Sequence, residues 1–426
     1  MATPDFESID PTGDISALSF KLDEILKPTL DQKNQYSEIT TPYALRRLML
    51  NQIRDREFWS QIKNVFDPCC GKGGFVIDMI SRFMDGYWEQ MFDPLIRYKF
   101  IVENLIYFND INPDNIAIVK KIIDPTNIYQ LHFSCQDALA PLPDSWPPGF
   151  DLVIMNPPYN KPGRVQRGSV LYTKFIKQAL SCWVRHDIGN FISINPPSWR
   201  RPCGDKSLCK GLFQLMTHDN WMKNLSIHDQ RDGYKFFNCG TRFDYYHIVA
   251  SGVVGLTHIK PLTGDDYDYF LDNYNWWPND YSLDFLCCIT GDIKQKMEYS
   301  TIRDFKDEPD AIYCKKLVHS TNISGIRYKY GKQTPASGPK VIFGVSGIKN
   351  NAVIDSTGEL GLTQGAVAIH EPDIRFLSVI KEAIESERFS KIMKICEFST
   401  FGFGKYMFKD FRDQFWTLFI VTPTIN

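Results

Sequence analysis

Short apolar runs alternate with amphipathic segments between about residues 61 and 250. Four of the runs end in polar residues, namely KNVFD (63–67), LIYFND (105–110), FDLVIMN (150–156) and NFISIN (190–195). Segments with helical spacing lie between them, such as 113–122 and 171–186. This alternation predicts a doubly wound α/β domain with a mostly parallel sheet. Because ligands of such sheets bind at the carboxyl ends of the strands, the polar residues there are candidate site residues.

The region before this domain predicts less regular structure. Residues 1–35 are typical of an irregular or partly helical leader. Residues 41–55 (TPYALRRLMLNQIRD) predict a helix, because apolar positions recur at helical spacing after Thr41 and Pro42. We expect Thr41 to be the N-cap of this helix and Pro42 its first residue.

The pattern changes after about residue 255. Aromatic residues and turn-forming Gly, Pro and Asn become frequent, and 372–396 is the one clear helical segment. We therefore predict a second domain of mixed or β-rich structure. The expected parts of the chain are a leader over 1–35, a ligand-binding α/β domain over 36–254 and the second domain over 255–426.

Composition limits the functions that the chain can have. Its 426 residues are 43% hydrophobic and 23% charged, with a formal net charge of -2, so any nucleic-acid-binding surface has to be local. The acidic N-terminus predicts no signal peptide, and no apolar run approaches the roughly 20 residues that span a bilayer. The 11 cysteines are scattered over the chain rather than set in a small disulfide framework, which favours an intracellular protein. They also lack metal-binding spacing, so we expect no structural metal.

A glycine-rich turn follows the first strand, in FDPCCGKGGF (66–75). Gly71, Gly73 and Gly74 would let the backbone approach a ligand, and the following helix offers free N–H groups. The spacing differs from the dinucleotide-binding GxGxxG pattern, so a tight turn without a ligand is the competing interpretation.

Acidic residues end the next two strands. Asp110 can accept hydrogen bonds from both ribose hydroxyls of a nucleoside, and Asp137 is placed to bind the amino group of an adenine ring. Either residue alone is more often a cap or a turn residue. Their joint placement at successive strand ends favours a nucleoside-containing ligand, although an apparent insertion over 85–101 lengthens the spacing from the glycines.

The strongest motif is Asn156-Pro157-Pro158-Tyr159, directly after an apolar strand. The exocyclic amino group of adenine is a poor nucleophile because its lone pair is delocalised into the ring. The Asn156 side-chain oxygen and the Pro157 carbonyl can accept its two N–H bonds, and consecutive prolines hold both acceptors in place. Tyr159 offers a ring on which a base extruded from a duplex can stack. A rigid proline turn that merely closes a strand is the competing interpretation.

A second copy of the tripeptide occurs at Asn195-Pro196-Pro197, again after a strand. Its fourth residue is Ser198, which has no ring to stack a base. We interpret this copy as a structural turn beside the pocket.

Together these motifs resemble the N6-adenine DNA methyltransferases in which the cofactor motifs precede the catalytic motif, closest to the Eco57I-like and type I modification-subunit branch. The resemblance covers about residues 35–250 and implies a Rossmann-like fold, with S-adenosylmethionine as cofactor. YSEITTPYALRRLML (36–50) is similar to the family's N-terminal motif. The implied cofactor-binding residues are Thr40, Thr41, Pro42, Asp67, Cys69, Gly71, Gly73, Asp110, Ile111, Asp137, Ala138 and Asn156.

The segment 228–249 resembles the family's last conserved hairpin. There an aromatic residue stacks on the second face of the flipped adenine. Phe237 matches that position best, with Phe236 as the alternative and core packing as the competing role of either residue.

Basic residues gather in the second domain, where 315–349 holds seven Lys and Arg and no Asp or Glu. We expect a surface that contacts the phosphates of double-stranded DNA, with an ordinary basic loop as the alternative. The candidate contacts are Lys315, Lys316, Arg327, Lys329 and Lys332. The resemblance thus implies that 255–426 recognises the target, so that a separate specificity subunit is not expected, while a cognate restriction endonuclease is a candidate partner.

Two other functions compete with adenine methylation of DNA. Some RNA and protein-glutamine methyltransferases carry an Asn-Pro-Pro-aromatic loop, but they are usually shorter and lack the Thr-Pro segment. A binding subunit without activity is the other alternative, and the intact Asn156, Tyr159 and Asp110 argue against it.

Overall fold

The computed structural model describes residues 7–25, 27, 39–53, 55–61, 63–160, 171–322, 324–332, 338–345, 351–399 and 402–420. Two compact units form, the first from Met1–Trp199 with Leu208–Asn275 and the second from Arg200–Ser207 with Trp276–Asn426. Unit 1 thus extends past residue 254, where we expected the α/β domain to end, because two further strands after that point join its sheet.

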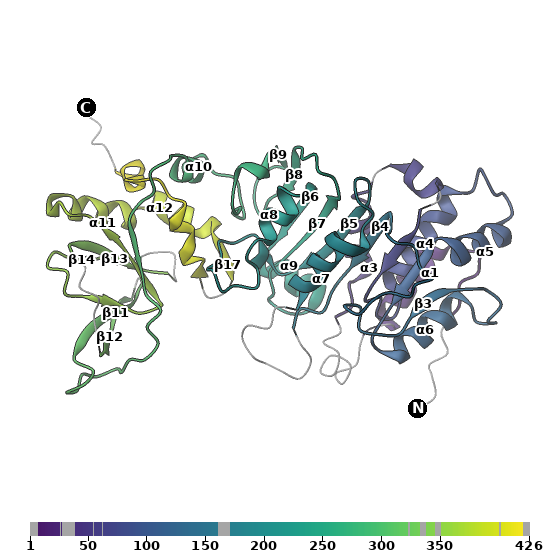
Figure 1. Ribbon diagram of the computed structural model, residues 1–426, viewed down its shortest axis with the longest axis horizontal. Coiled ribbons are helices and arrows are strands. Elements are labelled where there is room, and N and C mark those ends of the chain that lie inside the picture. Colours follow the sequence, from purple (N-terminus) through teal and green to yellow (C-terminus); the bar gives the residue numbers. More distant parts are fainter. Residues whose placement is uncertain are drawn as a thin grey trace. The chain divides into compact units, whose positions relative to one another are not determined.

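Unit 1 is built on a nine-stranded sheet of order β3-β2-β1-β4-β5-β7-β6-β8-β9 (Figure 1). The strands are β1 (Val65–Asp67), β2 (Ile106–Asn109), β3 (His132–Ser134), β4 (Leu152–Met155), β5 (Asn190–Asn195), β6 (Trp221–His228), β7 (Phe243–Val249), β8 (Thr257–Lys260) and β9 (Tyr267–Tyr269). The first five are parallel, and β7 runs antiparallel to β5 and β6. The predicted doubly wound α/β fold is confirmed, and its strand order reverses between β1 and β4.

Helices cover this sheet. They are α1 (Ile15–Ile25), α3 (Tyr43–Leu50), η1 (Arg56–Ser60), α4 (Gly74–Gly86), α5 (Pro94–Asn104), α6 (Pro113–Ile123), α7 (Tyr172–Gln178), η2 (Ala179–Trp183), η3 (Pro197–Trp199), α8 (Leu212–Thr217), α9 (Gln230–Phe237) and η4 (Leu271–Asn273). Local signals start several of them: the Asp93 carboxylate caps α5 and the Asn112 amide caps α6, each with Pro in the first turn. The apparent insertion contains α5, which buries Tyr98 and Ile101.

The N-terminal elements differ from the sequence-based expectation. Within the expected leader, α1 packs on α4 and buries Ile15 and Leu22 in the core of unit 1. The expected N-cap of the next helix is wrong, because α3 starts at Tyr43 with Pro42 as its N-cap and no capping side chain. The Thr41 hydroxyl is instead a partner of Asn156.

Unit 2 contains three small sheets of order β10-β16-β13-β14, β12-β11-β15 and β17-β18. The strands are β10 (Met297–Tyr299), β11 (Lys315–Asn322), β12 (Gly325–Gly331), β13 (Lys340–Gly344), β14 (Val353–Asp355), β15 (Gly361–Leu362), β16 (Ala366–His370), β17 (Glu397–Ser399) and β18 (Gly402–Phe403). The helices are α10 (Leu283–Ile289), η5 (Ile374–Phe376), α11 (Leu377–Glu385), α12 (Glu387–Ile395), η6 (Lys405–Lys409) and η7 (Phe415–Phe419). The β-rich expectation is confirmed.

The one helix expected over 372–396 is two helices. Ser386 ends α11 in an extended conformation, and its hydroxyl accepts a hydrogen bond from the Phe389 N–H at the start of α12. Both helices pack on an aromatic core that includes Phe343 and Phe408. No helix among the described residues is long and apolar enough to cross a membrane.

Candidate active site

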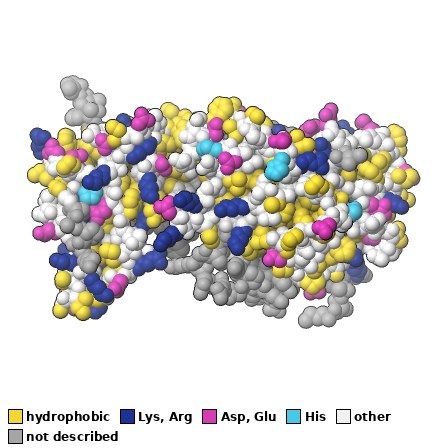
Figure 2. Space-filling view, in the orientation of Figure 1, with side chains coloured by type: hydrophobic (Ala, Val, Ile, Leu, Met, Phe, Trp, Pro, Cys, Tyr) yellow, Lys and Arg dark blue, Asp and Glu magenta, His cyan; other side chains and the backbone are white. Residues whose placement is uncertain are grey.

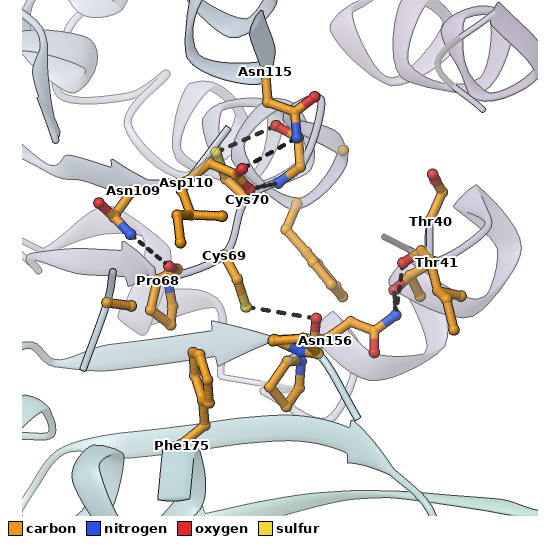
Figure 3. A pocket seen from close by; sticks show the side chains of 18 of the residues that line it. Thr40, Thr41, Pro68, Cys69, Cys70, Asn109, Asp110, Asn115, Asn156 and Phe175 are labelled. Atoms are coloured by element: carbon orange, nitrogen blue, oxygen red, sulfur yellow. Dashed lines mark hydrogen bonds between the residues drawn. The ribbon is translucent and has the colours of Figure 1, made fainter. Parts of the chain in front are cut away.

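A cavity of about 360 Å³ opens in unit 1 at the carboxyl ends of β1, β2, β3 and β4 (Figure 3). Its volume lies within the range of small-molecule sites. The cavity lining includes most of the residues that the sequence nominates: Thr40, Thr41, Cys69, Gly71, Asp110, Ile111, Asp137, Ala138, Asn156, Pro157, Pro158 and Tyr159. Pro42, Asp67, Gly73 and Phe237 lie outside the lining.

The glycine-rich turn adopts backbone conformations that other residues rarely adopt. Gly71 has φ 52° and Gly73 has φ 90°. A Cβ on Gly73 would also lie 2.9 Å from a Val119 methyl group on α6. Gly73 is the N-cap of α4, so it sets the close approach of this helix to α6 rather than lining the cavity.

Asp110 ties this turn to the end of β2. One carboxylate oxygen accepts from the Gly71 N–H at 2.8 Å, and the other accepts from the Asn112 N–H at 2.8 Å and the Asn115 amide at 3.2 Å. Burial raises the pKa of Asp110, although these hydrogen bonds act in the opposite direction. Since each carboxylate oxygen has two lone pairs, Asp110 keeps acceptor capacity towards the cavity.

Asn109 is a structural partner that the sequence analysis did not single out. Its amide nitrogen donates to the Pro68 carbonyl at 2.9 Å and the Gln136 carbonyl at 3.1 Å. Its oxygen accepts from the Ser134 hydroxyl at 2.7 Å. One side chain therefore joins the chain segments that follow β1 and β3, and an Asn at the end of a fully buried strand was the available signal.

Asp67 is buried behind the glycine-rich turn. One oxygen accepts from the Cys69 N–H at 3.2 Å, while the other has no hydrogen-bond partner among the described residues. Burial raises the pKa of Asp67 well above its usual range, and the nearby Asp110 carboxylate raises it further. Asp67 is therefore a buried acid that supports the glycine-rich turn from outside the cavity lining.

Polar and apolar side chains both line the cavity near the end of β3. Asp137 is exposed and accepts from the Leu139 N–H at 3.0 Å, whereas Ala138 is buried. Ile111 is 55% exposed although it is apolar. An exposed aliphatic side chain beside a carboxylate suits a heteroaromatic ring with an amino substituent.

The side-chain amide of Asn156 is held in one orientation (Figure 3). Its nitrogen donates to the Ile39 carbonyl and to the Thr41 hydroxyl, both at 3.0 Å. Because a backbone carbonyl can only accept, the NH₂ group has to face Ile39. The amide oxygen then points elsewhere, and no hydrogen bond from the described residues reaches it.

The rest of the motif forms a rigid wall. Pro157 is buried and Tyr159 is half-buried, with its ring edge-to-face against Tyr172 at 6.3 Å between centroids. Burial raises the pKa of Tyr159, and the Cys239 and Cys69 thiols add to this, so the phenol is neutral at physiological pH. Cys239, in the turn after α9, therefore lies near Tyr159.

The second Asn-Pro-Pro copy and the two candidate stacking residues, Phe236 and Phe237, all lie outside the cavity lining. Asn195 is fully buried, and its oxygen accepts from the Tyr246 hydroxyl at 2.8 Å. Phe237 and Phe236 lie edge-to-face on Phe243, at 5.3 and 6.3 Å between centroids, and neither lines the cavity.

Four charged residues of the lining were missed: Asp23 from α1, Arg46 from α3, Lys72 from the glycine-rich turn and Lys174 from α7. The Arg46 guanidinium donates to Asp23 at 2.7 Å and to Asp78 at 2.6 Å. An Arg on the apolar face of the helix was the signal, since Arg46 is buried with Leu45 and Met49. Among the described residues, no cluster of three or more His, Cys, Asp or Glu side chains is placed to hold a metal ion.

The candidate DNA contacts lie in unit 2, on and beside the β11–β12 hairpin. The segment before this hairpin supplies acidic partners: Asp307 pairs with Lys329, which is buried, and Asp304 pairs with Lys332 at 2.9 Å. The expected excess of positive charge is therefore smaller than the sequence of 315–349 indicated. The exposed cations within the hairpin itself are Lys315, Lys316 and Arg327, while Lys349 lies outside the described residues.

Comparison with known proteins agrees with the geometry. A family model described as N-6 DNA Methylase matches residues 25–181. The fold is similar to that of the type IIL restriction-modification enzyme MmeI in complex with DNA, with a TM-score of 0.51 and 10% identity over 92% of this chain and 68% of that one. It is also similar to a type I restriction-modification methyltransferase subunit from Streptococcus thermophilus, with a TM-score of 0.42 and 14% identity over 59% of this chain and 53% of that one.

No curated protein sequence matches the chain. The chain spans about half the length of the type I restriction-modification structures that it resembles, 52% and 50% in two of them. The family match includes the glycine-rich turn, the Asp110 strand end and the Asn156 motif, and so agrees with the resemblance inferred from those residues. Residues 25–181 are therefore similar to the N-6 DNA methylase family.

Proposed function

We propose that the chain is a DNA methyltransferase that transfers a methyl group from S-adenosylmethionine to the N6 amino group of an adenine flipped out of double-stranded DNA. The observation that carries this proposal is the Asn156 amide, whose nitrogen is bound by the protein and whose oxygen is left for a ligand. An acceptor at this position, with Pro157 and Tyr159 in the same wall, matches an amino group that donates two hydrogen bonds.

Each residue of the motif would have its own task. The Asn156 oxygen and the Pro157 carbonyl accept the two N–H bonds of the adenine amino group and draw its lone pair out of conjugation. Tyr159 stacks on the ring, which favours the extruded base by about 1–3 kcal/mol. When bound, S-adenosylmethionine supplies an electrophilic methyl group on sulfur. The methylated nitrogen then carries positive charge and releases a proton to solvent, so no general base is needed before the transfer.

The cofactor would occupy the part of the cavity around the glycine-rich turn. Thr40, Thr41 and Cys69, which line the cavity, would contact its methionine moiety, with Pro42 and the buried Asp67 behind them. Asp110 would accept from the ribose hydroxyls, with Ile111, Asp137 and Ala138 around the adenine ring. Phe237 remains the proposed second stacking residue, and it would have to turn away from Phe243 to reach a base.

The proposal is tested by giving the purified chain radiolabelled S-adenosylmethionine with DNA, RNA or protein. We expect label in DNA alone, and N6-methyladenine at one sequence context when the gene is expressed in a methylation-deficient host. Label only in RNA or protein would show that the competing substrate class is right. Activity of the chain alone would also support target recognition by unit 2 without a specificity subunit, whereas a requirement for a second chain would contradict it.

Cofactor affinity is expected to fall as the pH is lowered. The pKa values of Asp67 and Asp110 are both raised, chiefly by burial, so these groups take up protons at a pH above the usual carboxyl range. A ligand with positive charge favours the ionised forms, so binding releases protons and weakens as the pH falls through the raised values. Isothermal titration calorimetry in buffers of different ionisation enthalpy measures this release. Equal affinity across the range, or no loss of proton release in Asp67→Asn, would contradict the assignment.

The exposed cations of the β11–β12 hairpin are expected to contact DNA phosphates. On the face drawn in Figure 2, Lys and Arg side chains are interspersed with Asp and Glu, so exposed unpaired cations matter more than net charge. Changing Lys315 or Arg327 to Ala should weaken DNA binding and make the slope of log K against log salt shallower by about 1 for each phosphate that is no longer neutralised. Lys332→Ala is the matched control, because Asp304 already neutralises Lys332. Equal losses of affinity in all three variants would show that ion pairing does not select the contacts.

A further inference from the structure

The N-terminal segment holds the catalytic amide through two contacts of different chemistry. The Ile39 carbonyl and the Thr41 hydroxyl both accept from the Asn156 amide nitrogen. The carbonyl sets which end of the amide faces the segment, and the hydroxyl adds a second acceptor for the other N–H. If these acceptors were displaced, the amide could turn and present its NH₂ group to the adenine amino group, where two donors would face each other.

The position of Thr41 depends in turn on Arg46. The guanidinium of Arg46, which is 2% exposed, donates to the Thr41 carbonyl at 2.7 Å. Carboxylates hold the guanidinium on two sides: Asp78 from α4 at 2.6 Å and Asp23 from α1 at 2.7 Å. A planar guanidinium paired in this way is fixed in orientation.

The packing around Arg46 leaves little room for another arrangement. A Cβ on Gly74 would lie 2.8 Å from the central carbon of the guanidinium, so glycine is needed for α4 to pass this close. Ser19 of α1 accepts from Arg46 at 3.0 Å and donates to Asp78. Four side chains on three helices thus form one network, and the Arg46 guanidinium at its centre also donates to the Thr41 backbone carbonyl.

We propose that Arg46 and Thr41 are positioning residues that fix the orientation of the Asn156 amide, and so couple α1 and α3 to the catalytic motif. This role rests on the proposed function of Asn156 in methyl transfer. It gives Thr41 a task apart from packing against the cofactor, and it explains why a charged side chain occupies the buried face of α3.

Thr41→Val and Thr41→Ser separate the hydroxyl from the shape of the side chain. Valine keeps the branched shape that would pack against the cofactor, whereas serine keeps the acceptor. We expect Thr41→Val to lower kcat about tenfold, which corresponds to one lost hydrogen bond, with the cofactor Kd changed by less than about twofold. Thr41→Ser should recover most of kcat. A valine variant as fast as wild type, or a serine variant as slow as the valine variant, would overturn the role of the hydroxyl.

A second measurement does not depend on activity. In protein labelled with ¹⁵N-asparagine, the Asn156 side-chain NH₂ signals are assigned by their loss in Asn156→Ala. We expect Thr41→Val and Arg46→Lys to shift these signals and speed their hydrogen exchange, while Thr41→Ser leaves them close to wild type. Unchanged signals in Thr41→Val would refute the positioning role even if Arg46→Lys does not fold. If the wild-type chain transfers no methyl group to DNA while the Thr41→Val signals are shifted as expected, only the proposed function would be refuted.

Discussion

An Asn156→Ala variant is expected to lose methyl transfer by about 10²–10³-fold in kcat, the scale seen when one preorganised hydrogen-bonding group is removed from a reaction centre. Alanine removes the oxygen that accepts from the adenine amino group, and it leaves the nucleophile in its unreactive, conjugated state. Cofactor affinity should change little, because the glycine-rich turn and Asp110 are untouched. Initial rates with labelled cofactor, together with calorimetric binding, measure the two effects separately.

The second tripeptide provides a matched control within the same chain. Asn195→Ala removes an amide that is 0% exposed and bonded to Tyr246, so we expect it to lower stability by about 1–3 kcal/mol. Its kcat per folded molecule should stay far above that of Asn156→Ala. The catalytic assignment would be wrong if the Asn156 variant kept its activity, or if Asn195→Ala produced the same loss at equal fractions of folded protein.

The strand ends were predictable because two local signals agree with one general rule. Polar residues end short apolar runs, and parallel strands bring their carboxyl ends to one edge. Asp110, Asp137 and Asn156 therefore line one cavity although they lie far apart in the chain. Gly71 and Gly73 were likewise visible, because glycine adopts a backbone conformation with positive φ at the lowest cost.

The residues that hold these groups were not predictable in the same way. Asp23, Arg46 and Asp78 carry no motif, and their pairing depends on how α1, α3 and α4 pack. The Thr41 hydroxyl was expected to cap a helix, but a contact with the distant Asn156 uses it instead. Local preference is weak wherever a tertiary partner competes for the same group.

The charge of the basic segment in unit 2 was also not predictable from the local sequence alone. Counting over 315–349 found no acidic residue, yet Asp304 and Asp307 come from the preceding segment and pair with Lys332 and Lys329. Such partners lie outside any window that is drawn around a basic run. The exposed fraction and pairing of each cation, rather than the local sum of charges, therefore select the candidate DNA contacts.

The second large expected effect is a loss of stability in unit 2, where a row of charged side chains crosses the four-stranded sheet. Lys340 on β13 is 0% exposed, and its ammonium lies 3.0 Å from the Glu298 carboxylate on β10 and 3.9 Å from Asp355 on β14. His370 on β16 lies between these strands and contacts Glu298 at 3.2 Å. Lys340 is in register with both Asp355 and His370, so the row crosses the whole four-stranded sheet.

Lys340→Met is therefore expected to destabilise unit 2 by about 3–5 kcal/mol, because it removes the fully buried ammonium that lies between the Glu298 carboxylate and the buried Asp355 carboxylate. Denaturant unfolding measures the loss, and hydrogen exchange of peptides from β13 and β16 assigns it to this sheet. Lys315→Met is the matched control, since Lys315 is exposed and the same change there should stay within about 0.5 kcal/mol. Adding Glu298→Gln to Lys340→Met should restore part of the stability by lowering the excess of negative charge that remains in the row. Equal stability of Lys340→Met and Lys315→Met would mean that the row of charges does not stabilise the sheet. If the double variant is no more stable than Lys340→Met, lost packing rather than charge causes the effect.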